Sequence, residues 1–259
     1  MTPGLSTACF YPMKTEEALK TVGELGFSST EVFFNTISEL TPDFLRELAN
    51  IQNSYSLRIN SVHPMASFAE SYMLFSTYER RYYDTVELYK HYFNAANILG
   101  ANIVVIHGSR IPGVIETQEY YERFGNLIDE GQKQGIIVAH ENVVGTMGQA
   151  PQRMIEMQKA IGDKFKIVFD IKQSVRSGFQ PIEFIEQLYK QVVQVHISDH
   201  NDEFDCLPPG EGNFNFADFI HFLTDKGYNG DYIIELYNHS FSNYNQLLDS
   251  KEYIQSLKW

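Results

Sequence analysis

Cysteine is scarce in this chain: Cys9 and Cys206 are the only two among 259 residues. They form no disulfide framework, and there is no CxxC pair to bind a metal through thiolates. No apolar run approaches the length of a transmembrane helix, and the N-terminus lacks the basic start and apolar stretch of a signal peptide. We therefore expect a soluble, cytoplasmic protein with no membrane partner and no cysteine metal site.

Basic residues are also few, with 20 Lys and Arg against 33 Asp and Glu and a formal net charge of -13. A protein that binds the phosphate backbone of nucleic acid normally carries a basic patch, so we expect no nucleic-acid partner. The hydrophobic content of 43%, including 14% aromatic residues, is ample for a core and argues against disorder.

Short apolar runs alternate along the chain with longer amphipathic stretches. Helices are expected over residues 15–25, 82–99, 116–134, 150–161, 181–190, 216–226 and 244–257, and from Pro42 behind the cap residue Thr41. Four of these helices are followed by a glycine, which ends a helix by adopting the left-handed conformation: Gly26, Gly100, Gly135 and Gly227. Eight strand–helix alternations predict an α/β protein, a single (β/α)8 TIM barrel forming one domain over residues 1–259.

A doubly wound open sheet is the alternative architecture. It normally has a glycine-rich phosphate loop directly after its first strand. The first strand is expected over residues 5–11, and the segment Cys9-Phe10-Tyr11-Pro12-Met13 does not resemble such a loop. The barrel is therefore favoured.

Six of the apolar runs end in a side chain that can bind a divalent metal: His63, His107, Glu141, Asp170, His196 and Glu235. Burying a charge costs free energy unless the charge is paired or bound to a metal. The C-terminal strand ends of a barrel face one mouth, where the active site lies, so we expect these side chains to meet there. His140 has the opposite parity to Glu141 and is expected to point away from the mouth.

Six short segments follow one another at these strand ends: Val105-Ile106-His107-Gly108, His140-Glu141-Asn142, Val168-Phe169-Asp170, Val195-His196-Ile197-Ser198-Asp199, Gly210-Glu211-Gly212-Asn213-Phe214 and Ile233-Ile234-Glu235. Each alone is a weak signal. Together, over nearly the whole chain, they resemble the xylose-isomerase-like TIM-barrel superfamily of sugar (phosphate) isomerases and epimerases. Inosose dehydratases and apurinic-site endonucleases are related to this group.

The resemblance implies roles for four residues. Glu141, Asp170, His196 and Glu235 match the ligands of one divalent metal ion, for which carboxylates and an imidazole favour Mn, Mg, Co, Fe or Zn. Glu141 and Glu235 also match a catalytic pair that lies on opposite faces of the substrate. With a hydroxy-ketone polarised by the metal, one glutamate would remove a proton to give an enediolate and the other would return it.

Three further positions qualify the resemblance. His63 and His107 match residues that hold an additional metal in the endonucleases but contact the substrate in the single-metal sugar enzymes, and both roles stay open. Gln173 stands where the family often has a histidine, and we expect it to bind substrate without binding metal. No Asp-x-His segment follows His196, so a third metal site is missing and the nuclease reading loses support.

Three cationic residues lie near these strand ends. Arg110 follows His107, and Lys172 and Arg176 follow Asp170. Each can meet a phosphate or carboxylate of a substrate, as we expect of Arg110 and Lys172, or remain a solvated loop charge.

The sequence thus predicts a divalent-metal-dependent isomerase or epimerase that acts on a small sugar, sugar phosphate or polyol through an enediolate. The first alternative is an inosose-type dehydratase, a lyase. A phosphodiester hydrolase of the apurinic-site endonuclease type comes third, and a sugar-binding barrel without turnover is the non-enzymatic alternative. The sequence leaves a homo-oligomer open.

Overall fold

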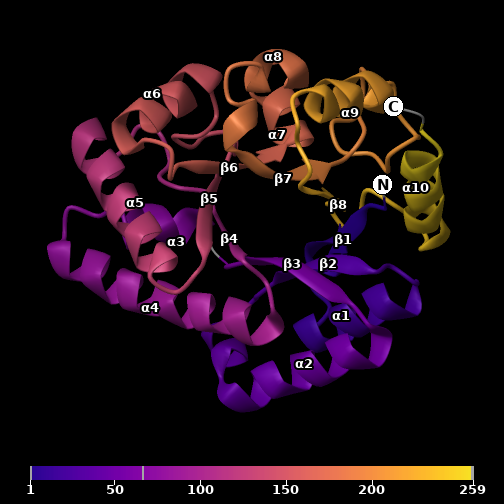
Figure 1. Cartoon of the computed structure of the whole chain (residues 1–259), viewed down its shortest axis with the longest axis horizontal. Helices are drawn as coiled ribbons and strands as arrows, with labels where there is room; N and C mark the ends of the chain where they lie inside the picture. Colours follow the sequence, from indigo (N-terminus) through magenta and orange to yellow (C-terminus); the bar gives the residue numbers. More distant parts are fainter. Residues whose placement is uncertain (1, 66, 258–259) are drawn as a thin grey trace.

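Eight parallel strands form a closed barrel in chain order, and β1 pairs with both β2 and β8 (Figure 1). The computed structural model describes residues 2–65 and 67–257, apart from the side chains of residues 67 and 68. The strands are β1 (Gly4–Ser6), β2 (Ser29–Phe33), β3 (Arg58–His63), β4 (Ile103–Ile106), β5 (Ile137–Glu141), β6 (Lys166–Asp170), β7 (Val192–Ile197) and β8 (Asp231–Ile234). The predicted (β/α)8 barrel is confirmed.

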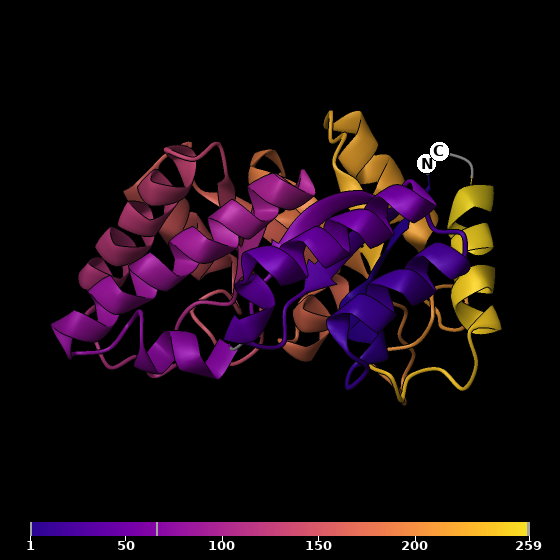
Figure 2. The same cartoon turned by 90° about the horizontal axis from the view of Figure 1, so that it is seen from below.

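The helices form a ring outside the strands (Figure 1). They are α1 (Thr15–Glu24), α2 (Pro42–Tyr55), α3 (Ser67–Tyr72), α4 (Glu79–Leu99), α5 (Thr117–Gln132), α6 (Pro151–Ile161), α7 (Ile171–Arg176), α8 (Pro181–Ile185), α9 (Phe216–Asp225) and α10 (Asn245–Ser256). Gln255 of α10 donates to Thr2, so the beginning and end of the described chain lie side by side (Figure 2). No helix among the described residues is long and apolar enough to cross a membrane.

Local signals predicted the helix boundaries well. The four predicted glycines all have positive φ, between 70° and 83°, and each follows the end of a helix. Thr41 and Pro42 occupy the cap and first position of α2, although the Thr41 side chain makes no capping hydrogen bond.

Two expected elements differ from the structure. The expected strand over residues 5–11 is wrong beyond Ser6: the Ser6 hydroxyl accepts a hydrogen bond from Ala8 N, and a 3-10 helix (Thr7–Phe10) replaces the strand. The helix expected over residues 181–190 ends early, and a short 3-10 helix (Tyr189–Gln191) leads into β7. Helix α3 lies in the segment after His63, where no helix bounds were predicted.

The interior of the barrel is apolar on one side and polar on the other. Ile103, Val105, Ala139 and Val168 form a small apolar cluster inside the strands. The other side has buried polar residues from four strands: Ser6, Glu31, Ser61 and Gln194. Barrel interiors are normally filled with bulky branched apolar side chains, so the polar side is unusual.

Candidate active site

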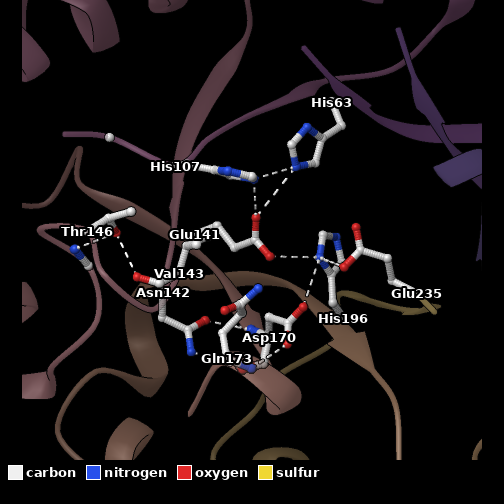
Figure 3. A network of polar contacts seen from close by, with 12 residues as sticks. His63, His107, Glu141, Asn142, Val143, Thr146, Asp170, Gln173, His196 and Glu235 are labelled. Atoms are coloured by element: carbon white, nitrogen blue, oxygen red, sulfur yellow. Dashed lines mark hydrogen bonds and ion pairs between the residues drawn. The ribbon is translucent and has the colours of Figure 1, made fainter. Parts of the chain in front are cut away.

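All six strand-end side chains meet at one mouth of the barrel (Figure 3). His63, Glu141 and Asp170 are the last residues of β3, β5 and β6, and His196 lies near the end of β7. His107 and Glu235 come directly after β4 and β8. The side chains form two groups that share Glu141, and in each group the candidate ligand atoms lie within 4.8 Å of one another.

The larger group surrounds the Nδ1 atom of His196. Glu141 Oε1 and Glu235 Oε2 each lie 3.3 Å from this nitrogen, and Asp170 Oδ2 lies 3.8 Å from it (Figure 3). His196, Glu141 and Asp170 are almost fully buried. Three carboxylates and one imidazole that converge in this way form a donor set suited to one hard or borderline divalent cation.

The two carboxylate oxygens of Glu141 have different neighbours. Oε1 faces His196, whereas Oε2 lies 2.8 Å from His107 Nε2 and 3.5 Å from His63 Nε2. The two histidine Nε2 atoms are 2.9 Å apart. Oε2 is buried and makes no hydrogen bond of good geometry within the described chain. The two imidazoles balance the charge of this oxygen, and it can also accept a proton or a polar group from a ligand.

Asp170, the last residue of β6, is held by Asn142, which directly follows β5, and by the start of helix α7. Its backbone N–H donates to Asn142 Oδ1 (2.6 Å) and its carbonyl accepts from Asn142 Nδ2 (2.9 Å). Its Oδ1 caps helix α7 by accepting from the N–H of Gln173 (2.9 Å). These contacts leave Oδ2 to face His196 and Lys172.

The cationic and amide residues predicted from the sequence lie in different surroundings. Lys172 is buried in the site, where its ammonium forms ion pairs with Asp170 Oδ2 and with Glu235 Oε2, the latter at 2.5 Å. Gln173 lines the same pocket, and its Oε1 accepts from Val144 N (3.1 Å).

Two arginines lie further from the six side chains. The side chain of Arg110 is exposed, and its backbone forms a bridge with Thr146. Arg176 binds Asp205 through two hydrogen bonds and donates a third to the Tyr237 hydroxyl. The structure therefore brings Lys172 and Gln173, but not Arg110, together with the strand-end residues.

Opposite charges dominate the pKa values of the two catalytic candidates. Burial acts to raise the pKa of Glu141, but the charge of His107 and contacts with His196 and His63 outweigh burial and hold it well below its usual range. For Glu235, burial is likewise outweighed by Lys172 and His196, and its pKa also lies well below the usual range. Both glutamates are therefore carboxylates at neutral pH, as a proton acceptor requires.

The neighbouring groups shift in the other direction. Burial, with the charges of Glu141 and Glu235, raises the pKa of Asp170 to about 7 despite the nearby Lys172. Burial acts to lower the pKa of His63, but its contact with Glu141 and the charge of Glu31 raise it to about 9. Such shifts are common where charged groups are gathered for binding or catalysis.

A pocket of about 420 Å³ opens above these residues. Its polar wall includes His63, His107, Glu141, Lys172, Gln173 and Glu235. The rest of its lining is largely apolar and aromatic, with Tyr11, Phe33, Met65, Leu236 and Tyr237. A pocket lined by both carboxylates and aromatic side chains is suited to a small molecule that has both hydroxyl groups and C–H faces.

One residue of the site was not predicted from the sequence. Glu31 lies in the middle of β2, points into the barrel and places Oε2 3.1 Å from His196 Nε2. Burial acts to raise the pKa of Glu31, but the charge of His196 outweighs it and lowers the pKa. In the sequence, Glu31 stands out only as an acidic residue inside the otherwise uncharged segment Ser29–Phe33. The prediction considered only residues at strand ends and therefore missed it.

His140 lies where parity placed it, away from the mouth. Its Nε2 is 2.7 Å from the Tyr120 hydroxyl and its Nδ1 is 2.8 Å from the Glu141 carbonyl oxygen. Burial lowers the pKa of His140 to about 4, so the ring is neutral. It therefore supports the backbone of Glu141 from the outer side of β5.

A family model described as "Xylose isomerase-like TIM barrel" matches residues 19–259. The chain belongs to the xylose isomerase-like TIM-barrel family. The resemblance inferred from the strand-end segments is thereby confirmed.

Among similar proteins, an uncharacterized protein of Methanocaldococcus jannaschii is 26% identical over 90% of this chain and 82% of its own length. An inosose dehydratase of Clostridium botulinum is 21% identical, covering 85% of this chain and 81% of its own length. The crystal structure of a D-tagatose 3-epimerase-like protein superposes with a TM-score of 0.83 at 25% identity, covering 98% of this chain and 96% of the other. The proteins that this chain resembles thus include one named for epimerisation and one named for dehydration.

Proposed function

We propose that this protein is a divalent-metal-dependent isomerase or epimerase that acts on a small sugar or related polyol ketone. The observation that carries the proposal is the position of two glutamates around one imidazole. Glu141 and Glu235 both line the pocket, and each has one oxygen 3.3 Å from Nδ1 of His196. A carboxylate can bind a metal through one oxygen and accept a proton through the other.

Glu141, Asp170, His196 and Glu235 would hold the metal ion. The fit rests on the donor set of three carboxylates and one imidazole, whose candidate ligand atoms lie within 4.8 Å of one another. When bound, a divalent ion supplies a positive charge that polarises the carbonyl of the substrate and makes the adjacent C–H more acidic.

The two glutamates would move the proton. Strands β6 and β7 separate β5 from β8 in the barrel, so Glu141 and Glu235 reach the pocket from different sides (Figure 3). Glu141 Oε2, which lies 2.8 Å from His107 Nε2, would remove a proton from one face of the substrate. Glu235, after taking up a proton from solvent, would deliver that proton to the other face and invert that carbon, and Glu141 would release the proton it removed to solvent.

The charges around the pocket favour an unphosphorylated substrate. Lys172 is the only lysine or arginine among the described residues that line the pocket, and two carboxylates already bind it. Arg176, behind Tyr237, is bound to Asp205. No cation in the described part of the pocket is left without an acidic partner, so a phosphate would lack a strong binding group.

The experiment is an activity assay of protein stripped with EDTA and reloaded with Mn²⁺. Unphosphorylated ketohexoses and ketohexose phosphates are supplied separately, and products are separated by chromatography. The proposal expects epimers or isomers of the unphosphorylated sugars, with activity lost in EDTA and in Glu141→Gln. Activity that is unchanged by EDTA, or in Glu141→Gln, contradicts it.

Dehydration is the second candidate, and the observation that favours it is the state of His63. The side chain lines the pocket, and its pKa of about 9 keeps it protonated at neutral pH. A protonated imidazole could donate its proton to a hydroxyl group that leaves from the carbon next to an enediolate. Accumulation of a dehydrated diketone from a keto-inositol would select this reaction. A product with the same mass as the substrate, with no water lost, would select isomerisation.

A further inference from the structure

Glu31 is a wholly buried carboxylate beneath the mouth of the barrel. Its Oε2 accepts hydrogen bonds from Ser61 Oγ (2.7 Å) and Gln194 Nε2 (2.8 Å), and its Oε1 accepts from Ser6 Oγ (3.3 Å). Donors from three strands therefore converge on one acid. Burying an ionised carboxylate is costly even when it is paired, so an apolar side chain would serve stability at least as well.

Glu31 also reaches across the barrel to His196. The two residues lie on β2 and β7, which are separated by β1 and β8, yet Glu31 Oε2 is 3.1 Å from His196 Nε2. The opposite ring nitrogen, Nδ1, is the atom that faces Glu141, Asp170 and Glu235. The His196 ring thus connects the buried Glu31 carboxylate with the cluster of candidate metal ligands.

The contact determines which nitrogen of His196 can bind a cation. A neutral imidazole carries one N–H and one lone pair. An ionised carboxylate only accepts hydrogen bonds, so Glu31 requires the N–H to be on Nε2. The lone pair then lies on Nδ1, where the three other carboxylates converge. The opposite tautomer would aim a proton at the metal position and a lone pair at Glu31.

We propose that Glu31 is a positioning residue that fixes His196 as a metal ligand through Nδ1 and strengthens metal binding. The inference rests on the proposed metal site. Glu31 is not among the described residues that line the pocket, so it acts through His196 and does not touch the substrate. A carboxylate behind a metal-binding histidine fixes the ring orientation and raises its basicity, and loss of such a partner typically weakens metal affinity about 10- to 100-fold.

The test is calorimetric titration of Mn²⁺ into EDTA-stripped wild-type protein, Glu31→Gln and Ser61→Ala. Glu31→Gln keeps the shape of the side chain but removes its charge, and metal affinity should fall about 10- to 100-fold. Ser61→Ala removes one donor from the same buried network but keeps Glu31 against His196, so its affinity should change by no more than about threefold. Equal losses in the two variants would overturn the inference, because general packing would then explain both.

The wild-type titration separates the inference from the proposed function. A wild-type protein that binds no divalent ion overturns both, whereas Glu31→Gln that binds Mn²⁺ as tightly as wild type overturns only the role of Glu31. A second measurement needs no variant: nitrogen-15 NMR of histidine-labelled wild-type protein loaded with Zn²⁺. The inference expects the His196 proton on Nε2 and the metal on Nδ1, and the reverse assignment overturns it.

Discussion

The Lys172 ammonium lies 2.5 Å from Glu235 Oε2, the same oxygen that lies 3.3 Å from Nδ1 of His196. Lys172 also binds Asp170 Oδ2, the oxygen of Asp170 nearest to His196. Two oxygens suited to holding a metal ion thus already have a cationic partner. Lys172 should therefore stabilise the protein while it opposes the binding of a second cation.

Replacement of Lys172 should separate these two effects. In Lys172→Gln, the free energy of unfolding in EDTA should fall by about 3 to 5 kcal/mol, because two buried carboxylates lose their partner. Affinity for Mn²⁺ should rise by at least about tenfold, since a positive charge next to the site is gone. Chemical denaturation and calorimetric titration measure the two quantities.

Arg176→Gln is the control for Lys172→Gln. It breaks the ion pair with Asp205 at a more exposed position, so the free energy of unfolding should change by less than about 1 kcal/mol. Its Mn²⁺ affinity should match that of wild type. Weaker metal binding in Lys172→Gln would show that the ammonium supports the metal site and does not compete for it.

Gln173 is predicted to contact the substrate and not the metal. Its side chain lines the pocket, while its Oε1 is bound to Val144 N. In Gln173→Ala, KM should rise about three- to tenfold through loss of a hydrogen bond, with metal content unchanged. Asp170→Asn is the matched comparison and should lose metal. Elemental analysis of both variants decides the point, and a Gln173→Ala protein without metal contradicts the prediction.

Acid should destabilise the fold through His140. Its pKa is about 4 in the folded protein against an ordinary value of 6.5, so the unfolded chain binds a proton first as the pH falls. The stability that this neutral histidine contributes is complete above pH 6.5 and is lost between pH 6.5 and 4. Linkage gives a loss of about 2 kcal/mol between pH 7.5 and 5.

The measurement is the free energy of unfolding in EDTA at both pH values for wild type and His140→Gln. The variant should lack this part of the pH dependence. His221→Gln removes an exposed histidine and serves as the control, with the pH dependence of wild type. If His140→Gln responds to acid as strongly as wild type, His140 is not the group responsible.

One metal ion per chain is the expected stoichiometry. His63, His107 and Glu141 form a second cluster, but the two imidazoles are 2.9 Å apart and both line the pocket, as substrate contacts would. His107→Asn should therefore keep one Mn²⁺ per chain while kcat/KM falls. Two Mn²⁺ ions in wild type and one in His107→Asn would instead assign the histidines to a second metal.

The sequence predicted the site best where an apolar strand pattern is followed directly by a residue that can bind a metal. Apolar runs that end in a polar side chain located the residues of the mouth, because parallel strands in a barrel all end on the same side. The same reasoning missed Glu31, which lies inside a strand and reaches a partner on β7 that is 165 residues away in the chain. Nothing in a local pattern records a contact across the barrel interior.

Side-chain direction after a strand was harder to predict. Lys172 was expected to meet a substrate anion or solvent, since two residues beyond a strand a charge usually lies in a loop. In the structure Asp170 caps α7 directly, and this turn carries Lys172 back over the carboxylates. The expected first strand failed for a related reason, because the Ser6 side chain begins a 3-10 helix that no apolar pattern indicates.

The central claim is that Glu141 and Glu235 exchange a substrate proton with solvent. The most direct measurement is to incubate an unphosphorylated ketohexose in D₂O with the Mn²⁺-loaded enzyme. The metal is then removed by chelation, and proton NMR of the sugar is recorded. Wild type should incorporate deuterium at the carbon next to the carbonyl, and Glu141→Gln and Glu235→Gln should each slow this at least about 100-fold. Epimer or isomer formed without any deuterium uptake, or undiminished uptake in both variants, would contradict the account.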